Sequence, residues 1–400
     1  MSLSLYCFSF YIFLSYFQFL FASVLPLNLP HKLVSLGLLI FSVLVIKKKV
    51  ISSGFALWLA IIIFLNIISF YFLAFDTELI GYGRTIMYLL YKLPEVALIC
   101  IFVSSHDKNR LYVILPRVRN WFVISSFILF LYFVLVYFNI LPYIHRFIAF
   151  NSDRFGGLVG EPRDFGLLSF VFLMSTFAFP DKNSIWQRGI LAVFVVSSGS
   201  NAVVLLILAL LWYYIFSMKP KATLVLSVFI FFSLYGVIST IDFKIGRFDL
   251  DASELVNIAT SFNPNNPPPA LNPITVRFFN FVFNLYWMSK GWFSYGIGSS
   301  MDIAYNQQLF DYNVYESSTG LFGFTTIGVE LGLVGLAIVL ISAFSFQVKV
   351  HHLGWLSLLS FSILIVILLL SSPYSAFYLF LLLYVYKIGL NEKVLKGRFQ

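Results

Sequence analysis

The chain has 400 residues, of which 60% are hydrophobic and only 11% are charged, and its mean hydropathy is +0.91. A soluble domain is about half apolar, so this composition excludes a soluble globular protein and predicts a single integral membrane domain over residues 1–400. The net charge is +9, but the basic residues are dispersed through short interhelical loops, which argues against nucleic acid as a partner.

Apolar segments of roughly 17–25 residues are long enough to cross a bilayer as helices. The first segment lacks the basic start of a signal peptide, so we expect it to be a retained helix. Two divisions depend on short polar breaks, at Ser197–Asn201 and at Ser371–Pro373. The sequence predicts about twelve membrane spans, near 4–25, 30–46, 51–75, 85–104, 121–142, 164–180, 186–200, 201–218, 222–240, 321–345, 354–371 and 373–390.

The loops between these spans differ in charge. With the N-terminus in the cytoplasm, sixteen of the 26 basic residues fall in cytoplasmic loops or the C-terminal tail, and nine fall in outer loops. Basic residues favour the cytoplasmic side, so this orientation places both termini in the cytoplasm. Two outer loops then stand out, residues 143–163 and the long loop 241–320.

The long outer loop contains one stretch that looks helical. Its section Phe262–Pro273 is rich in Pro and Asn and cannot be a regular helix. Near 275–290, Arg277, Asn280 and Asn284 recur at helical spacing among apolar residues, which predicts a short amphipathic helix. The helix is interfacial or re-entrant, and its polar stripe faces either the protein interior or the lipid headgroups.

Charge is concentrated just before the predicted span at 164–180. Arg154, Glu161 and Arg163 lie within ten residues of one another, in a chain where charge is scarce. Guanidinium groups bind phosphate oxygens in bidentate fashion, so the two arginines are candidate phosphate ligands. Glu161 is a candidate general base, or else it orients an arginine.

Charged residues within the predicted spans have simpler interpretations. Lys92 and Glu95 are three residues apart, and we expect them to pair with each other. Glu330 lies between Gly328 and Gly332, a spacing that lets another helix approach closely. It is either a structural carboxyl group or a partner for a polar group of the site. We expect no disulfide, metal site, cofactor or nucleotide-binding motif.

Three motifs resemble those of the Wzy-type O-antigen polymerases, which are relatives of the O-antigen ligases. The first is the segment from Arg154 through Gly160-Glu161-Pro162, before a helix. The second is the serine-rich turn Ser197–Asn201 between two spans. The third is Gly296-Ile-Gly298 closing the long loop, followed by Gly328–Gly335 in the next helix. The resemblance covers roughly residues 120–340.

The resemblance implies a GT-C-like, all-α polytopic glycosyltransferase of the bacterial inner membrane that is independent of metal ions. Such enzymes polymerise undecaprenyl-diphosphate-linked oligosaccharides at the periplasmic face during lipopolysaccharide synthesis. Its partners would be that donor and acceptor, membrane lipids and a chain-length-regulating co-polymerase. The ligases place a histidine near the end of the long loop, whereas residues Tyr315–Gly323 contain none, which favours a polymerase.

The resemblance and the charge pattern together assign roles to five residues. Arg154, Arg163 and Glu161 are the expected catalytic residues, and Arg154, Arg163, Arg277 and Lys290 are the expected ligands of the diphosphate. The alternatives are an O-antigen ligase, a capsule or exopolysaccharide polymerase, and a flippase for the same lipid-linked repeat. A flippase needs charges along a central path, whereas here they lie mainly at the outer rim.

Overall fold

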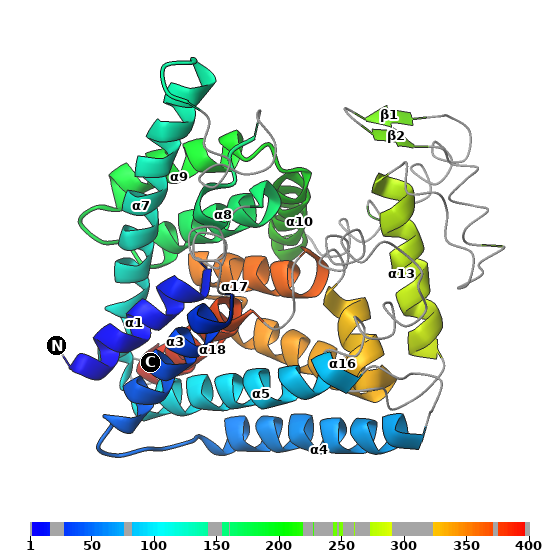
Figure 1. The fold of residues 1–400 in the computed structure, drawn as a ribbon. Coiled ribbons are helices and arrows are strands. Elements are labelled where there is room, and N and C mark those ends of the chain that lie inside the picture. Colours follow the sequence, from blue (N-terminus) through cyan, green and yellow to red (C-terminus); the bar gives the residue numbers. More distant parts are fainter. Residues whose placement is uncertain are drawn as a thin grey trace.

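The computed structural model describes residues 2–16, 28–75, 82–142, 154–159, 161–218, 227, 243–245, 248–250, 260, 273–289, 323–370 and 375–396. Their regular secondary structure is helical apart from one small pair of antiparallel strands, in which Phe243 pairs with Leu250 (Figure 1). The elements are α1 (Leu3–Tyr16), α3 (Asn28–Leu44), α4 (Ser53–Phe75), α5 (Tyr82–Ser105), α6 (Lys108–Leu111), α7 (Ile114–Tyr137), the 3-10 helix η1 (Gly157–Val159), α8 (Pro162–Ala178), α9 (Ser184–Ser197), α10 (Asn201–Met218), β1 (Phe243–Ile245), β2 (Phe248–Leu250), α13 (Pro273–Ser289), α16 (Gly323–Val350), α17 (Trp355–Ile365), the π-helix η3 (Val366–Leu370) and α18 (Ala376–Lys396).

Every predicted span except one overlaps a helix of the structure. The exception, 222–240, lies outside the described residues apart from residue 227. The division at Ser197–Asn201 is confirmed, because α9 ends at Ser197 and α10 begins at Asn201. Three described helical stretches are long and apolar enough to cross a membrane: Lys108–Tyr137, Asn201–Met218 and Gly323–Val350. The fold is that of a helical membrane protein.

The α10 surface shows the pattern expected of a helix that faces lipid. Leu205, Leu208 and Leu211 are about half exposed, whereas Leu206 and Leu210 are buried against the protein. On α9, Trp186 and Val196 are both 79% exposed. Water would oppose so much apolar exposure, but lipid chains do not, so these faces suit a bilayer.

Helix α8 is buried on almost every side. In Figure 1 it lies among α7, α9 and α10 in the upper part of the molecule. It packs in an antiparallel arrangement against α9 and also contacts α10 and α17. Aromatic rings fill the space between α8 and α7, where Phe122 lies between Phe165 and Phe172 with centroid distances of 5.6 and 4.9 Å. Because α8 is enclosed in this way, its two ends are held at defined places in the fold.

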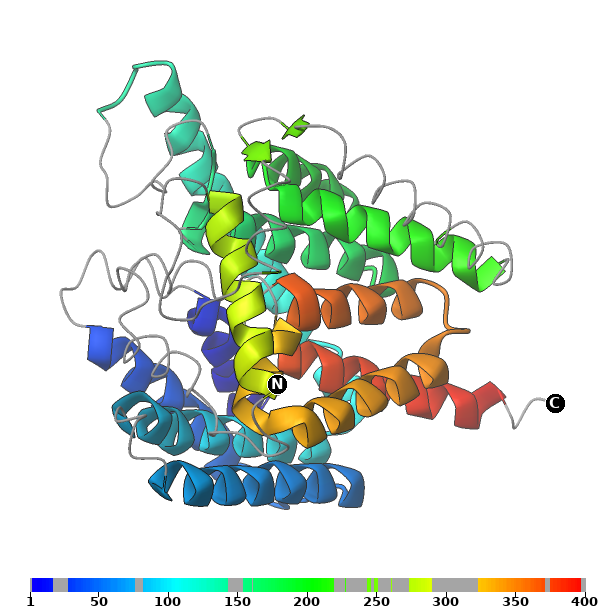
Figure 2. The ribbon, with the colours of Figure 1, turned by 90° about the vertical axis from the view of Figure 1, so that its right-hand side faces the viewer.

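Helix α13 packs against α16, as Figure 2 also shows. It occupies the stretch where the sequence predicts an amphipathic helix. Gly328 permits the close approach, because a Cβ atom there would lie 2.3 Å from Sδ of Met288. The side chain of Asn284 is buried in this contact and donates a hydrogen bond of 3.3 Å to Thr325. Gly332 does not continue the helix, since its φ of 72° interrupts α16.

The predicted pairing of Lys92 with Glu95 is confirmed. The ammonium group of Lys92 lies 2.7 Å from Oε2 of Glu95, and the hydroxyl of Tyr11 donates a 2.7 Å hydrogen bond to Oε1. Glu95 is only 2% exposed. A carboxylate buried to this extent is retained because both of its oxygens have partners, and here the partners join α1 to α5.

Candidate functional site

The segment that begins at Arg154 lies directly on the turn between α9 and α10. We call residues Ser197–Asn201 the serine turn. The backbone N–H of Phe155 donates a 3.1 Å hydrogen bond to the carbonyl of Ser197. Nε of Arg154 donates a 3.0 Å hydrogen bond to the carbonyl of Ser198. Two motifs that are more than forty residues apart in the sequence therefore form one unit.

The serine turn follows from how α9 ends. Gly199 has a φ of +53°, a conformation that glycine adopts without steric cost and that commonly ends a helix. Its N–H donates to the carbonyl of Val196, and the N–H of Ser198 donates to that of Phe194, each at 3.0 Å. A Cβ atom at Gly199 would come 3.4 Å from Nε of Arg154. Glycine thus makes the turn and leaves room for the arginine above it.

Phe155 anchors the Arg154 segment in the hydrophobic core. It is 1% exposed and packs against Phe130, Phe165 and Phe194, with centroid distances of 5.3, 5.0 and 6.1 Å. Burying one aromatic ring of this kind stabilises a structure by about 2–3 kcal/mol. The backbone at residue 154 is therefore held by the core, while the guanidinium group stays half-buried at the edge of the site.

The first turn of α8 carries the other charged groups. Pro162 is the first helical residue, a position that suits proline because no helical N–H is needed there. Nε of Arg163 lies 3.0 Å from Oδ1 of Asp164. Burial disfavours the charged guanidinium of Arg163, but the carboxylates of Asp164 and Glu161 outweigh that effect and raise its pKa.

The sequence leaves two roles open for Glu161, a general base or a residue that orients an arginine. Its side chain is exposed and makes no capping hydrogen bond at the start of α8. The direct ion-pair partner of Arg163 is Asp164, so Asp164 is the residue that orients this arginine. Glu161 acts on Arg163 only through its charge. An exposed carboxylate at this place is accessible to a substrate.

Three of the five predicted site residues lie on the serine turn or at the start of α8. Arg154 lies on the serine turn, and Glu161 and Arg163 lie at the start of α8, which approaches that turn at Gly166. Arg277 belongs to α13, whose principal contacts are with α16 and β2, and its side chain is not described. Lys290 lies outside the described residues. The candidate site is therefore the one around the serine turn.

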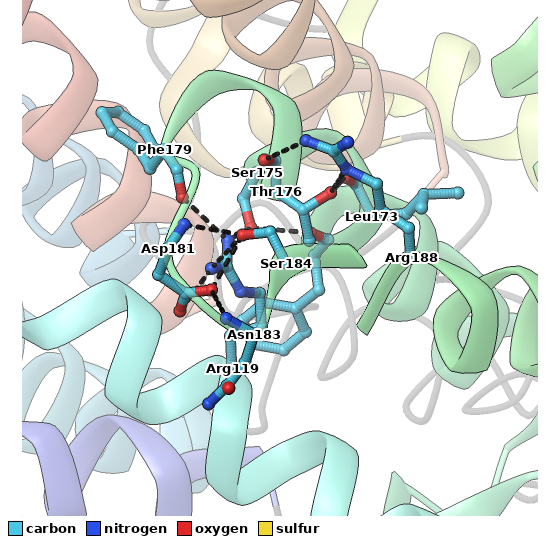
Figure 3. A network of polar contacts seen from close by, with 10 residues as sticks. Arg119, Leu173, Ser175, Thr176, Phe179, Asp181, Asn183, Ser184 and Arg188 are labelled. Carbon is cyan, nitrogen blue, oxygen red and sulfur yellow. Dashed lines mark hydrogen bonds and ion pairs between the residues drawn. The ribbon is translucent and has the colours of Figure 1, made fainter. Parts of the chain in front are cut away.

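A second polar cluster, at the opposite end of α8, is absent from the sequence predictions (Figure 3). Arg119 of α7 is fully buried and its Nη2 lies 2.9 Å from Oδ2 of Asp181. Its Nη1 donates to Ser175 at 3.2 Å and to the carbonyl of Phe179 at 3.3 Å. Asp181 also accepts a 2.8 Å hydrogen bond from Ser184. This cluster fastens the end of α8 to α7 and α9.

No family model, curated protein or solved structure matches this chain. The function is therefore inferred from the residues of the site. Within the described part of the chain, no three His, Cys, Asp or Glu side chains are grouped so as to hold a metal ion. The chemistry present at the serine turn is that of guanidinium, hydroxyl and carboxylate groups.

The Asp181 carboxyl group makes stability depend on pH. Burial alone would raise its pKa above 3.8, but the Ser184 hydroxyl and the Arg119 guanidinium outweigh burial and lower it. Its stabilising effect is therefore complete above the unfolded pKa and is lost as the pH falls through the lower folded value. We expect the midpoint temperature of unfolding of the detergent-purified protein to decrease when the pH is lowered below about 4, because carboxyl groups protonate there. In Asp181→Asn, the midpoint temperature should decrease less between pH 5 and pH 3 than it does in the unmodified protein. An equal decrease in both would contradict the role of Asp181 in this pH dependence.

Proposed function

We propose that the protein is an O-antigen polymerase that joins undecaprenyl-diphosphate-linked repeat units at the periplasmic face of the bacterial inner membrane. The proposal includes about twelve spans, with both termini in the cytoplasm. The observation that carries it is the placement of Arg154 on the serine turn beside the start of α8. Two motifs that resemble the polymerase family separately in the sequence are thereby parts of one site.

The chemistry of polymerisation fits these residues. An acceptor hydroxyl attacks the anomeric carbon of the donor sugar, the bond from that carbon to the diphosphate oxygen breaks, and the diphosphate leaves. The transition state resembles an oxocarbenium ion, and negative charge grows on the leaving group. Arg154 and Arg163 are positioned cations that stabilise this charge more in the transition state than in the ground state. Arg277 and Lys290 are further proposed ligands of the diphosphate.

The proton of the acceptor hydroxyl needs a base. Glu161 is the exposed carboxylate of the site, whereas Asp164 is engaged with Arg163. We therefore assign proton acceptance to Glu161 and orientation of the arginine to Asp164. The donor and the acceptor are both lipid-linked, so the exposed apolar faces of α9 and α10 lie where the polyprenyl chains would run. A chain-length-regulating co-polymerase is the proposed protein partner.

Deletion of the gene tests the proposal directly. In the deletion strain, we expect lipopolysaccharide gels to lose the ladder of long chains and to keep the band with a single repeat unit. The single repeat persists because ligation and translocation do not require polymerisation. Loss of every repeat, including the single one, would instead identify a ligase or a flippase. Expression of the intact chain from a plasmid is the control and should restore the ladder.

A further inference from the structure

Helices α8 and α10 begin side by side. Gly166 lies one turn into α8, and a Cβ atom there would come 2.4 Å from Oγ of Ser198 and 2.9 Å from Cγ2 of Val203 in the first turn of α10. A side chain at this position would force Ser198 or Val203 to shift. The start of a helix carries a partial positive charge and N–H groups without helical partners. Two such positive ends therefore meet at the serine turn.

The hydroxyl of Ser200, at the start of α10, is buried without a partner. The residue is 5% exposed, and within the described residues its Oγ makes no hydrogen bond. A serine inside a helix commonly bonds a carbonyl three or four residues back. Here those carbonyls, of Val196 and Ser197, already accept the N–H groups of Gly199 and Phe155. A buried polar atom left in this state is typically satisfied by a bound ion, ligand or water.

Arg154 supplies unused donors on the same turn that carries this hydroxyl. Its Nε is engaged with the carbonyl of Ser198, and its side chain lies over Gly199, the neighbour of Ser200. Among the described residues, no hydrogen bond or ion pair uses its two Nη groups. The nearby cation Arg163 is already paired with Asp164. Arg154 therefore offers a ligand its two Nη groups, and the helix starts reinforce its positive charge.

We propose that Ser200, the N-terminal turn of α10 and Arg154 form a binding site for a diphosphate group. A diphosphate presents acceptor oxygens to the hydroxyl, to the N–H groups of α10 and to the two Nη groups at once. This inference rests on the proposed function in one respect, since a polymerase would use the site for the diphosphate of its lipid carrier. Free pyrophosphate and a prenyl diphosphate both carry the diphosphate group that this site would bind.

Binding to the detergent-purified full-length protein tests the site. Isothermal titration with farnesyl diphosphate and with inorganic pyrophosphate should give saturable binding, and farnesol should give none. Ser200→Ala should weaken binding about tenfold, the equivalent of one hydrogen bond to a charged group. Ser200→Asp should abolish binding, because its carboxylate repels the anion. Aspartate remains a favourable capping residue at the position before α10, so the helix should still form.

Two variants serve as matched controls. Ser169→Ala removes another buried hydroxyl without a hydrogen bond in the described residues, but in the body of α8. Asn183→Asp adds the same charge as Ser200→Asp at the start of α9, at the far end of the α8–α9 pair. Both should bind diphosphate as the unmodified protein does. Tighter binding of farnesyl diphosphate than of pyrophosphate supports a lipid source, and equal binding supports the anion site alone.

The inference is overturned if neither diphosphate binds, or if Ser200→Ala and Ser200→Asp bind as tightly as Ser169→Ala. This failure is distinct from failure of the proposed function. If the deletion strain loses its long chains but the purified protein binds no diphosphate, the proposed polymerase function stands and the proposed diphosphate site at Ser200 is contradicted. If Ser200→Asp loses binding but keeps a normal ladder of chain lengths, the site exists and its use in polymerisation is wrong.

Discussion

Arg154→Ala should remove the ladder of long lipopolysaccharide chains while leaving the band with a single repeat. Removing one group that stabilises charge in a transition state typically lowers the rate by about 10²–10³-fold. Arg154 has this position because its guanidinium lies on the serine turn with both Nη groups available. Arg277→Ala should give the same product pattern if that residue also holds the diphosphate. Gel analysis of the complemented deletion strain measures both effects.

Polymerisation should require the geometry of the Arg154 guanidinium and not only its positive charge. Arg154→Lys keeps the charge but loses both the Nε contact to Ser198 and the paired Nη donors. We expect this variant to make short chains at most. Arg110 is an exposed arginine of α6, and Arg110→Ala is the matched control for loss of one positive charge. Immunoblots of membranes separate lost activity from lost protein. A normal ladder in both Arg154→Ala and Arg277→Ala would contradict the diphosphate role.

Much of the helix layout follows from hydrophobic patterning alone. The break between α9 and α10 was predictable because Ser197–Asn201 interrupts an apolar run with polar residues and a glycine. The pairing of Lys92 with Glu95 was predictable because the two lie three apart on one helix. Both inferences are local: they need only the spacing of residues along one segment.

Other features depend on contacts that no local pattern contains. Arg119 looks like one more basic residue near a cytoplasmic loop, and its burial follows from Asp181, which lies in a different turn. The spacing of Gly328 and Gly332 predicts a close helix contact, but it assumes a continuous helix. Gly328 makes such a contact, whereas Gly332 breaks α16 with a positive φ. Glycine permits both outcomes, so the sequence alone does not decide between them.

In the candidate site, too, some features could be predicted from the sequence and others depend on tertiary contacts. The charges around Arg154 were identifiable because they stand out in an apolar chain. Their partners were not, since Arg163 has carboxylates on both sides and the start of α8 decides which one it meets. The buried state of Ser200 was equally hidden, because burial follows from the packing of helices that are distant in the sequence. The sequence therefore locates the charged residues of the candidate site, whereas their pairing depends on the fold.

Asp181→Ala should destabilise the protein strongly, by about 3–5 kcal/mol, the usual cost of leaving a buried charge without its partner. The reason is the complete burial of Arg119, which keeps hydrogen bonds to Ser175 and Phe179 but loses its only described ion pair. Unfolding by heat in detergent micelles measures the effect as a lower midpoint. Lys182→Ala, which changes an exposed neighbour, is the control and should leave the midpoint unchanged.

The two partners of this ion pair should not be equivalent. Arg119→Met replaces the buried cation by an apolar side chain of similar length, and Asp181 is 27% exposed, so water can solvate the carboxylate left behind. We therefore expect Arg119→Met to destabilise less than Asp181→Ala. The double variant should resemble Arg119→Met, because removing Asp181 costs little once the cation is gone. Additive losses in the double variant would mean that the pair does not act as a unit, and that α8 is held by packing alone.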